Sequence, residues 1–215
     1  MPKVTVRNAR DILMETEYRE EHEIFIGHPG IFVDHFRYKL LYERGGWWID
    51  TDVLLLNDLY DRGLYYAYQD EHIVNNAVMC FPKAHAVMWE CWMQAEIIRK
   101  RETVAWGETG PYLLTQVLAN HGMLDQAIPR EQCYPLDFES VYAVFYNGLK
   151  SEVEHSLTQA TFLHLWNAKL PYGIDKYAIP EPGSWLRDQV DKLFASGEWE
   201  VWQRWSQPNV DADVL

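Results

Sequence analysis

The chain has 215 residues, a length that suits a single domain with a sizeable buried core. A formal net charge of −13 argues against nucleic acid or an anionic membrane as the main partner. The 3 cysteines form no Cys-x-x-Cys pair, so we expect a cytoplasmic protein. No apolar run reaches about 18 residues, so we expect no transmembrane segment, and peripheral membrane association stays open.

The first predicted elements are short. Val4–Val6 alternates apolar and polar residues as a strand does, and Asp11–Glu20 is typical of a helix with a polar face. Glu23–Ile26 predicts a second short strand, and the Gly-His-Pro-Gly stretch at residues 27–30 predicts a turn after it.

A longer helix is predicted over Ile31–Arg44, where apolar residues recur at helical spacing. The pair Gly45-Gly46 is a strong stop signal, because glycine adopts the left-handed conformation at little cost. Asp34, Arg37 and Tyr38 stand at positions i, i+3 and i+4, so they share one polar face of this helix. That face either carries an ordinary surface ion pair or turns toward the acidic residues that follow.

An apolar stretch after the glycines ends in the triplet Asp50-Thr51-Asp52. On a strand, Asp50 and Asp52 would share one face, with Ile49 and Val53 on the other. Two carboxylates on one face repel each other unless a positive group lies between them, and a hard divalent cation with oxygen ligands fits that role. The alternative is a strand end with two solvated aspartates.

Strands and helices continue to alternate after this triplet. Strands are predicted at Leu64–Tyr68, Val74–Phe81 and Thr161–Trp166, and helices at Ala84–Lys100, from Pro111 to His121-Gly122, and from a Ser184 cap to Gly197. This order predicts an α/β fold. We expect one domain over residues 1–205 and a disordered tail over residues 206–215.

The segment from Asp34 to Asp52 resembles the signature of nucleotide-sugar glycosyltransferases of the capsular-polysaccharide and α-1,4-glycosyltransferase type. That signature reads Asp-x-x-Arg-Tyr, followed by Leu-Tyr-x-x-Gly-Gly-x-Tyr-x-Asp-x-Asp. The matching residues are Asp34, Arg37, Tyr38, Leu41, Tyr42, Gly45, Gly46, Asp50, Thr51 and Asp52, and Trp48 replaces the usual tyrosine. Three later stretches are similar to bacterial members: Asn75–Ala77, Trp106–Pro111 and His164–Asn167.

The resemblance implies a GT-A fold, the Rossmann-like fold of nucleotide-diphospho-sugar transferases. It also implies a bacterial Asp-x-Asp enzyme of polysaccharide biosynthesis that transfers a sugar with retention of anomeric configuration. A divalent cation, Mn²⁺ or Mg²⁺, a nucleotide-sugar donor and a glycan or lipid-linked acceptor belong to the same expectation.

The start of the chain departs from the family pattern. Members usually open with a strand of the type Ile-x-x-x-Trp-x-Gly that helps to hold the nucleotide base and ribose, and no such stretch precedes Asp34. We therefore expect a domain that lacks the first strand–helix unit. A misassigned start, a truncation and a differently built donor site are the three explanations that stay open.

The resemblance implies that Asp50, Asp52 and His164 bind the cation, and Mn²⁺ accepts both carboxylate and imidazole. The candidate catalytic residues are Asp50, Asp52 and Glu108. The candidate substrate-binding residues are Asp34, Arg37, Tyr38, Gly46, Asn75, Asn76, Trp106, Trp166 and Asn167. Structural roles compete with these: a packed histidine at His164, a negative charge before a helix N-terminus at Glu108, and core packing for the tryptophans.

Two other functions compete with sugar transfer. Residues 49–54, Ile-Asp-Thr-Asp-Val-Leu, also resemble the nucleophile loop of haloacid-dehalogenase-like phosphatases, in which the first aspartate attacks phosphorus. That alternative does not explain Arg37 or Gly45-Gly46. The second alternative is a truncated, non-catalytic fold that binds glycans or a partner.

Overall fold

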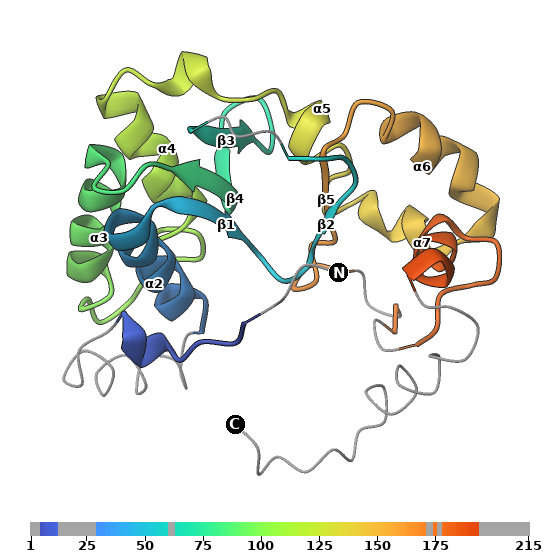
Figure 1. Cartoon of the computed structure of the whole chain (residues 1–215), viewed down its shortest axis with the longest axis horizontal. Helices are drawn as coiled ribbons and strands as arrows, with labels where there is room; N and C mark the ends of the chain where they lie inside the picture. Colours follow the sequence, from blue (N-terminus) through green and yellow to red (C-terminus); the bar gives the residue numbers. More distant parts are fainter. Residues whose placement is uncertain (1–4, 13–28, 60–62, 171–173, 176–177, 194–215) are drawn as a thin grey trace, which may run out of the picture.

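A computed structural model describes residues 5–12, 29–59, 63–170, 174–175 and 178–193. Helices and strands are mixed along this part of the chain, which confirms the α/β class (Figure 1). The strands are β1 (Gly46–Ile49), β2 (Val53–Leu55), β3 (Tyr65–Tyr68), β4 (Val74–Phe81) and β5 (Phe162–His164). The α-helices are α2 (Pro29–Arg44), α3 (Ala86–Ile98), α4 (Pro111–Asn120), α5 (Arg130–Cys133), α6 (Lys150–Ser156) and α7 (Trp185–Leu193). Short 3-10 helices are η1 (Ala9–Asp11), η2 (Leu124–Gln126), η3 (Val141–Phe145) and η4 (Asn147–Leu149).

The elements predicted before residue 29 are either wrong or fall largely outside the described residues. Thr5 and Val6 have no regular structure, so the strand predicted there is wrong for these two residues. The helix predicted over Asp11–Glu20 falls mainly outside the described residues, and the strand predicted over Glu23–Ile26 falls wholly outside them. The tail predicted over residues 206–215 also lies outside.

The larger sheet has the order β1-β4-β3, and both pairings are antiparallel. Its central strand β4 is buried along its whole length and has the bounds predicted from the sequence; all of its residues except Asn75 and Asn76 are apolar. Successive side chains alternate between the two faces, so Met79 and Phe81 pack on one core and Val78 and Cys80 on the other.

Each face of this sheet has its own cover. Helices α2, α3 and α4 close one face, where Tyr38, Leu41 and Leu114 are fully or almost fully buried with β4 (Figure 1). The opposite face packs against the second half of the chain, including α5, η3, β5 and α7. The segment between α4 and β5 contains only short helices, which sequence periodicity did not indicate.

Strand β2 leaves the larger sheet and pairs antiparallel with β5 instead. The triplet Asp50-Thr51-Asp52 was predicted to lie on a strand, and this prediction is wrong. The triplet forms the turn between β1 and β2, which belong to different sheets. The amide of Asp50 still donates to Ala77 O (2.8 Å), and the amide of Val53 closes the turn on Asp50 O (3.1 Å). Because Val53 faces His164 in the β2–β5 register, this turn lies beside the end of β5.

At the C-terminal end of the described chain, the predicted cap of α7 is confirmed, since Ser184 Oγ accepts the amide of Arg187 (3.2 Å). The predicted end of this helix at Gly197 lies outside the described residues. Among the helices described, none has the length and apolar character needed to cross a membrane.

Candidate functional site

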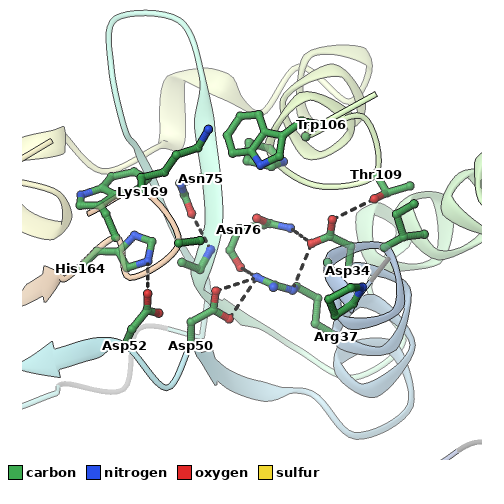
Figure 2. Close-up of a pocket in the computed structure, with 18 of the residues that line it drawn as sticks. Asp34, Arg37, Asp50, Asp52, Asn75, Asn76, Trp106, Thr109, His164 and Lys169 are labelled. Atoms are coloured by element: carbon green, nitrogen blue, oxygen red, sulfur yellow. Dashed lines mark hydrogen bonds and ion pairs between the residues drawn. The ribbon is translucent and has the colours of Figure 1, made fainter. Parts of the chain in front are cut away.

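A pocket of about 490 Å³ opens where the two sheets meet (Figure 2). Segments that are far apart in the sequence supply its lining. The polar and aromatic lining residues are Asp34 and Arg37 from α2, Asp50 and Asp52 from the turn, Asn75 and Asn76 from β4, Trp106 and Thr109 from the loop before α4, and His164, Trp166 and Lys169 at and after β5.

One side of the pocket carries three candidate cation ligands. Asp50, Asp52 and His164 each offer one ligand atom, and these atoms lie within 4.8 Å of one another. His164 Nε2 is 3.3 Å from Asp52 Oδ2, which in turn accepts the backbone amide of Asn167 at 3.0 Å. The other ring nitrogen, His164 Nδ1, is buried without a hydrogen-bond partner in the part of the chain described.

These donors fit a divalent cation. Carboxylate oxygens and an imidazole nitrogen suit Mn²⁺, whereas Mg²⁺ prefers oxygen ligands. Burial on its own would raise the pKa of Asp52, but the hydrogen bond and charge of His164 and the amide of Asn167 outweigh it and lower that pKa. The Asp52 carboxylate is therefore ionised at neutral pH.

Asp50 is more heavily engaged than Asp52. Its Oδ1 accepts the indole N–H of Trp48 at 2.6 Å, and Arg37 Nη1 lies 3.2 Å from the same oxygen. Arg37 also donates from Nη1 to the other carboxylate oxygen at 3.4 Å. The turn thus presents one carboxylate that is already neutralised by an arginine and one that is not.

The opposite wall is a buried polar network centred on Asp34 (Figure 2). Asp34 accepts hydrogen bonds from Asn76 Nδ2 (2.8 Å) and Thr109 Oγ1 (2.9 Å), and Arg37 Nε lies 3.5 Å away. Arg37, only 5% exposed, also donates to the backbone oxygen of Asn76 at 2.5 Å. Burial raises the pKa of Asp34, although Arg37 and the two hydrogen bonds oppose that shift.

Gly110 allows this wall to close. A Cβ at this position would lie 2.9 Å from Asp34 Oδ2, so only glycine lets the loop before α4 approach the carboxylate. Tyr38 completes the contact from beneath: it is fully buried, donates to Gly110 O at 3.1 Å and accepts Asn76 Nδ2 at 3.2 Å. Tyr38 therefore supports the wall and is not among the residues that line the pocket.

Three other predicted site residues, Glu108, Gly46 and Asn167, are also outside the lining of this pocket. Glu108 binds Arg101 and accepts the amide of Ala105 at 2.9 Å, so its carboxylate braces its own loop. Gly46 lies at the exposed start of β1 with φ +91°, where its role is the backbone turn after α2.

The remaining predicted residues line the pocket in different ways. The side chain of Asn75 is engaged with Gln69 Oε1 and the amide of Ala77, each at 2.7 Å. Trp166 is 8% exposed and its indole donates to Leu136 O at 2.9 Å, so it packs in the core as well as lining the pocket. Trp106 is 64% exposed, and its ring meets Tyr112 edge-on.

Asn167 lies on an adjoining hollow on the far side of the aspartate turn. Two polar lining residues, Thr109 and Lys169, were not predicted from the sequence. Thr109 stands within the Trp106–Pro111 stretch, so that motif contained a signal for it. Lys169 follows the His164–Asn167 stretch as an ordinary surface lysine, and nothing in the local sequence distinguished it.

Comparison with known proteins finds glycosyltransferases. The sequence is 25% identical over 150 residues to Lactosylceramide 4-alpha-galactosyltransferase from Rattus norvegicus. The aligned region covers 65% of this chain and 41% of that protein. The sequence is 26% identical over 144 residues to Alpha-1,4-N-acetylglucosaminyltransferase from Homo sapiens, covering 62% of this chain and 42% of that protein. The chain therefore spans about two fifths of the length of these relatives. No protein-family model matches it.

Among solved structures, the chain is similar to PaToxG Glycosyltransferase with a TM-score of 0.42 and 14% sequence identity, covering 67% of this chain and 50% of that one. The helices and strands described above form a mixed α/β arrangement with two antiparallel sheets. The homologues that share sequence with this chain are α-1,4-glycosyltransferases, in agreement with the resemblance of its Asp34–Asp52 segment.

Proposed function

We propose that the protein is a metal-dependent glycosyltransferase that moves a sugar from a nucleotide-sugar donor to a hydroxyl group of a glycan or lipid-linked acceptor. The observation that carries this proposal is the cluster of Asp50, Asp52 and His164, whose ligand atoms lie within 4.8 Å of one another beside a preformed polar pocket. Sequence similarity to two α-1,4-glycosyltransferases supports the same reaction class.

Asp50, Asp52 and His164 would hold Mn²⁺, with Mg²⁺ as the alternative. The cation would supply neutralisation of the leaving diphosphate. Asp52 and His164 are the better placed ligands, because Asp50 already shares its carboxylate with Arg37 and Trp48. Arg37 is buried and would fix the carboxylates of Asp34 and Asp50 in place.

The wall built by Asp34, Asn76 and Thr109 would bind the hydroxyl groups of the transferred sugar. Its donors and acceptors are fixed by one another, so little reorganisation is needed when a polar ligand enters. The exposed ring of Trp106 offers a flat face at the mouth, suited to an acceptor sugar. Retention of anomeric configuration is part of the proposal.

The biological setting belongs to the proposal as well. We propose a bacterial Asp-x-Asp enzyme of polysaccharide biosynthesis that acts in the cytoplasm, where nucleotide-sugars would be available. Cys80, Cys91 and Cys133 are buried and free, which suits a reducing compartment.

The experiment is incubation of the purified chain with Mn²⁺ and a panel of nucleotide-sugars, followed by measurement of nucleoside diphosphate release and by NMR of any glycoside formed. We expect Mn²⁺-dependent release for one donor, and an anomeric configuration in the product equal to that of the donor. Absence of release with every donor would contradict enzyme activity and favour the non-catalytic alternative.

Hydrolysis of a simple phosphomonoester would instead support the phosphatase alternative. The geometry disfavours that outcome, because a nucleophilic Asp50 would need a free oxygen. Both of its oxygens contact Arg37, and one also accepts the indole N–H of Trp48.

A further inference from the structure

Lys169 approaches Trp106 across the mouth of the pocket. Its Nζ lies 4.3 Å from the centroid of the Trp106 ring, so the segment after β5 meets the loop before α4 through a cation–π contact (Figure 2). Both residues line the same pocket as Asp52 and His164. The proposed function gives no role to Lys169 or to this contact.

The charges in the pocket make Lys169 distinctive. The described lining contains the acidic residues Asp34, Asp50 and Asp52 and the basic residues Arg37 and Lys169. Arg37 is buried and already paired with two of the three acids. Lys169 is exposed and has no carboxylate partner in the described part of the chain. It is therefore the positive side chain of the pocket that remains available to an anion.

The two halves of the contact differ in their freedom. Trp106 stands on a braced loop, in which Glu108 accepts the amide of Ala105 at 2.9 Å. In the same loop, Gly107 has φ +78° and packs so closely on Tyr112 that a Cβ would lie 3.1 Å from its ring. Lys169, in contrast, carries its ammonium on a flexible four-carbon stem. Ligand binding can therefore move Lys169 while Trp106 stays in place.

The backbone of Lys169 is tied to the candidate cation site. Its amide donates to Trp166 O at 2.7 Å, which closes a tight turn. Within that turn, the amide of Asn167 donates to Asp52 Oδ2 at 3.0 Å. A diphosphate bound to a cation at Asp52 and His164 would consequently lie at the base of the segment from which Lys169 projects.

Accepting the proposed function, we propose that Lys169 binds the diphosphate of the donor and that the Trp106 ring holds its ammonium group until the diphosphate replaces the ring. A charge-assisted hydrogen bond to phosphate is stronger than a cation–π contact at an exposed site, which sets the direction of the exchange. The exchange also uncovers the face of Trp106, so donor binding prepares the surface on which an acceptor sugar would stack.

Isothermal titration calorimetry tests this assignment with UDP, GDP and pyrophosphate, each in the presence of Mn²⁺, and with uridine and guanosine as ligands without phosphate. Lys169→Ala should weaken binding of the diphosphates about 10-fold and leave any nucleoside binding unchanged. Lys169→Arg should restore most of the affinity, because the positive charge is kept. Lys83→Ala, which changes an exposed lysine outside the pocket lining, is the matched control and should bind like the wild type.

A second variant separates the resting contact from a direct contact. Trp106→Ala should bind diphosphates as tightly as the wild type or more tightly, because Lys169 then has no ring to leave. A loss equal to that of Lys169→Ala would overturn the resting role of Trp106.

Equal diphosphate affinity of the wild type and Lys169→Ala would overturn the assignment of Lys169 alone. Failure of the wild type to bind any of the three diphosphates would overturn the proposed function together with it. The two failures are therefore distinguishable.

Discussion

The two sides of the pocket are built differently. On the α2 side, hydrogen bonds and an ion pair join Asp34, Arg37 and Asn76 to one another, and Arg37 and Asn76 are 5% exposed. On the β5 side, Asp52 and His164 share one contact of 3.3 Å, and His164 Nδ1 is buried without a described partner.

This difference separates a preformed surface from an incomplete one. The α2 side needs no ligand to hold its shape, because its polar side chains already bond to one another. On the β5 side, the ligand atoms of Asp50, Asp52 and His164 lie close together, and a cation would bind between them. Among the described residues, Asp52 has no salt bridge to a lysine or arginine that such a cation would displace. The account therefore predicts that changes on the β5 side affect activity, whereas changes on the α2 side also affect folding.

The largest effect is expected for Asp52→Asn. The variant keeps the shape of the side chain but loses the charge, so we expect metal-dependent donor turnover to fall at least about 100-fold. The melting temperature should change little, because Asp52 is partly exposed at a turn. Activity with Mn²⁺ and circular dichroism on the same samples measure both.

Asp125→Asn is the matched control, because Asp125 is exposed and does not line the pocket. This variant should behave like the wild type. Near-normal Mn²⁺-dependent turnover of Asp52→Asn would show that Asp52 is not a ligand.

Gly110→Ala should act on the other side, through the fold. A Cβ at this position would lie 2.9 Å from Asp34 Oδ2, so the loop and the carboxylate must move apart. We expect a loss of about 1–3 kcal/mol in the free energy of unfolding, measured by urea denaturation. Gly148→Ala is the control, since a Cβ there has no neighbour within 4 Å. Equal stability of the two variants would show that the wall is not tightly packed.

The smallest effect is a pH dependence that arises from Asp34. Burial raises its pKa above the ordinary value of 3.8, so the folded protein binds this proton more tightly than the unfolded chain does. The stability contribution of Asp34 is fully present below that ordinary pKa and is lost as the pH rises through the folded pKa.

Comparison with Asp34→Asn isolates this contribution, because the other titrating groups, including Asp52, are common to both proteins. Between about pH 3 and pH 7, the free energy of unfolding of the wild type should fall relative to that of Asp34→Asn. Urea denaturation at several pH values measures the difference. A difference that is constant, or that grows with pH, would contradict a raised pKa.

The sequence predicted the elements whose pattern is local. Strand β4 was found with the observed bounds because it is rich in β-branched and aromatic residues and ends at Pro82. Helix α2 was found because its apolar spacing ends at two glycines. The cap at Ser184 likewise depends on neighbouring residues.

What could not be predicted depends on partners distant in the chain. Asp50 and Asp52 read as part of a strand because the sequence does not reveal that β2 changes sheets to pair with β5. The ion pair between Glu108 and Arg101 could not be predicted either, because no local pattern joins these two positions. The cation–π contact of Lys169 could not be predicted, because its partner Trp106 is on a separate loop.

Binding of Mn²⁺ tests the central claim most directly, because it requires no knowledge of the donor or acceptor. Free Mn²⁺ gives a sharp electron paramagnetic resonance signal in solution, and binding to the protein removes it. We predict that the wild type binds one Mn²⁺ per chain and that His164→Gln and Asp52→Asn lose most of this binding, while Asp125→Asn retains it. An undiminished free Mn²⁺ signal with the wild type, or equal binding by wild type and His164→Gln, would contradict a cation site formed by Asp50, Asp52 and His164.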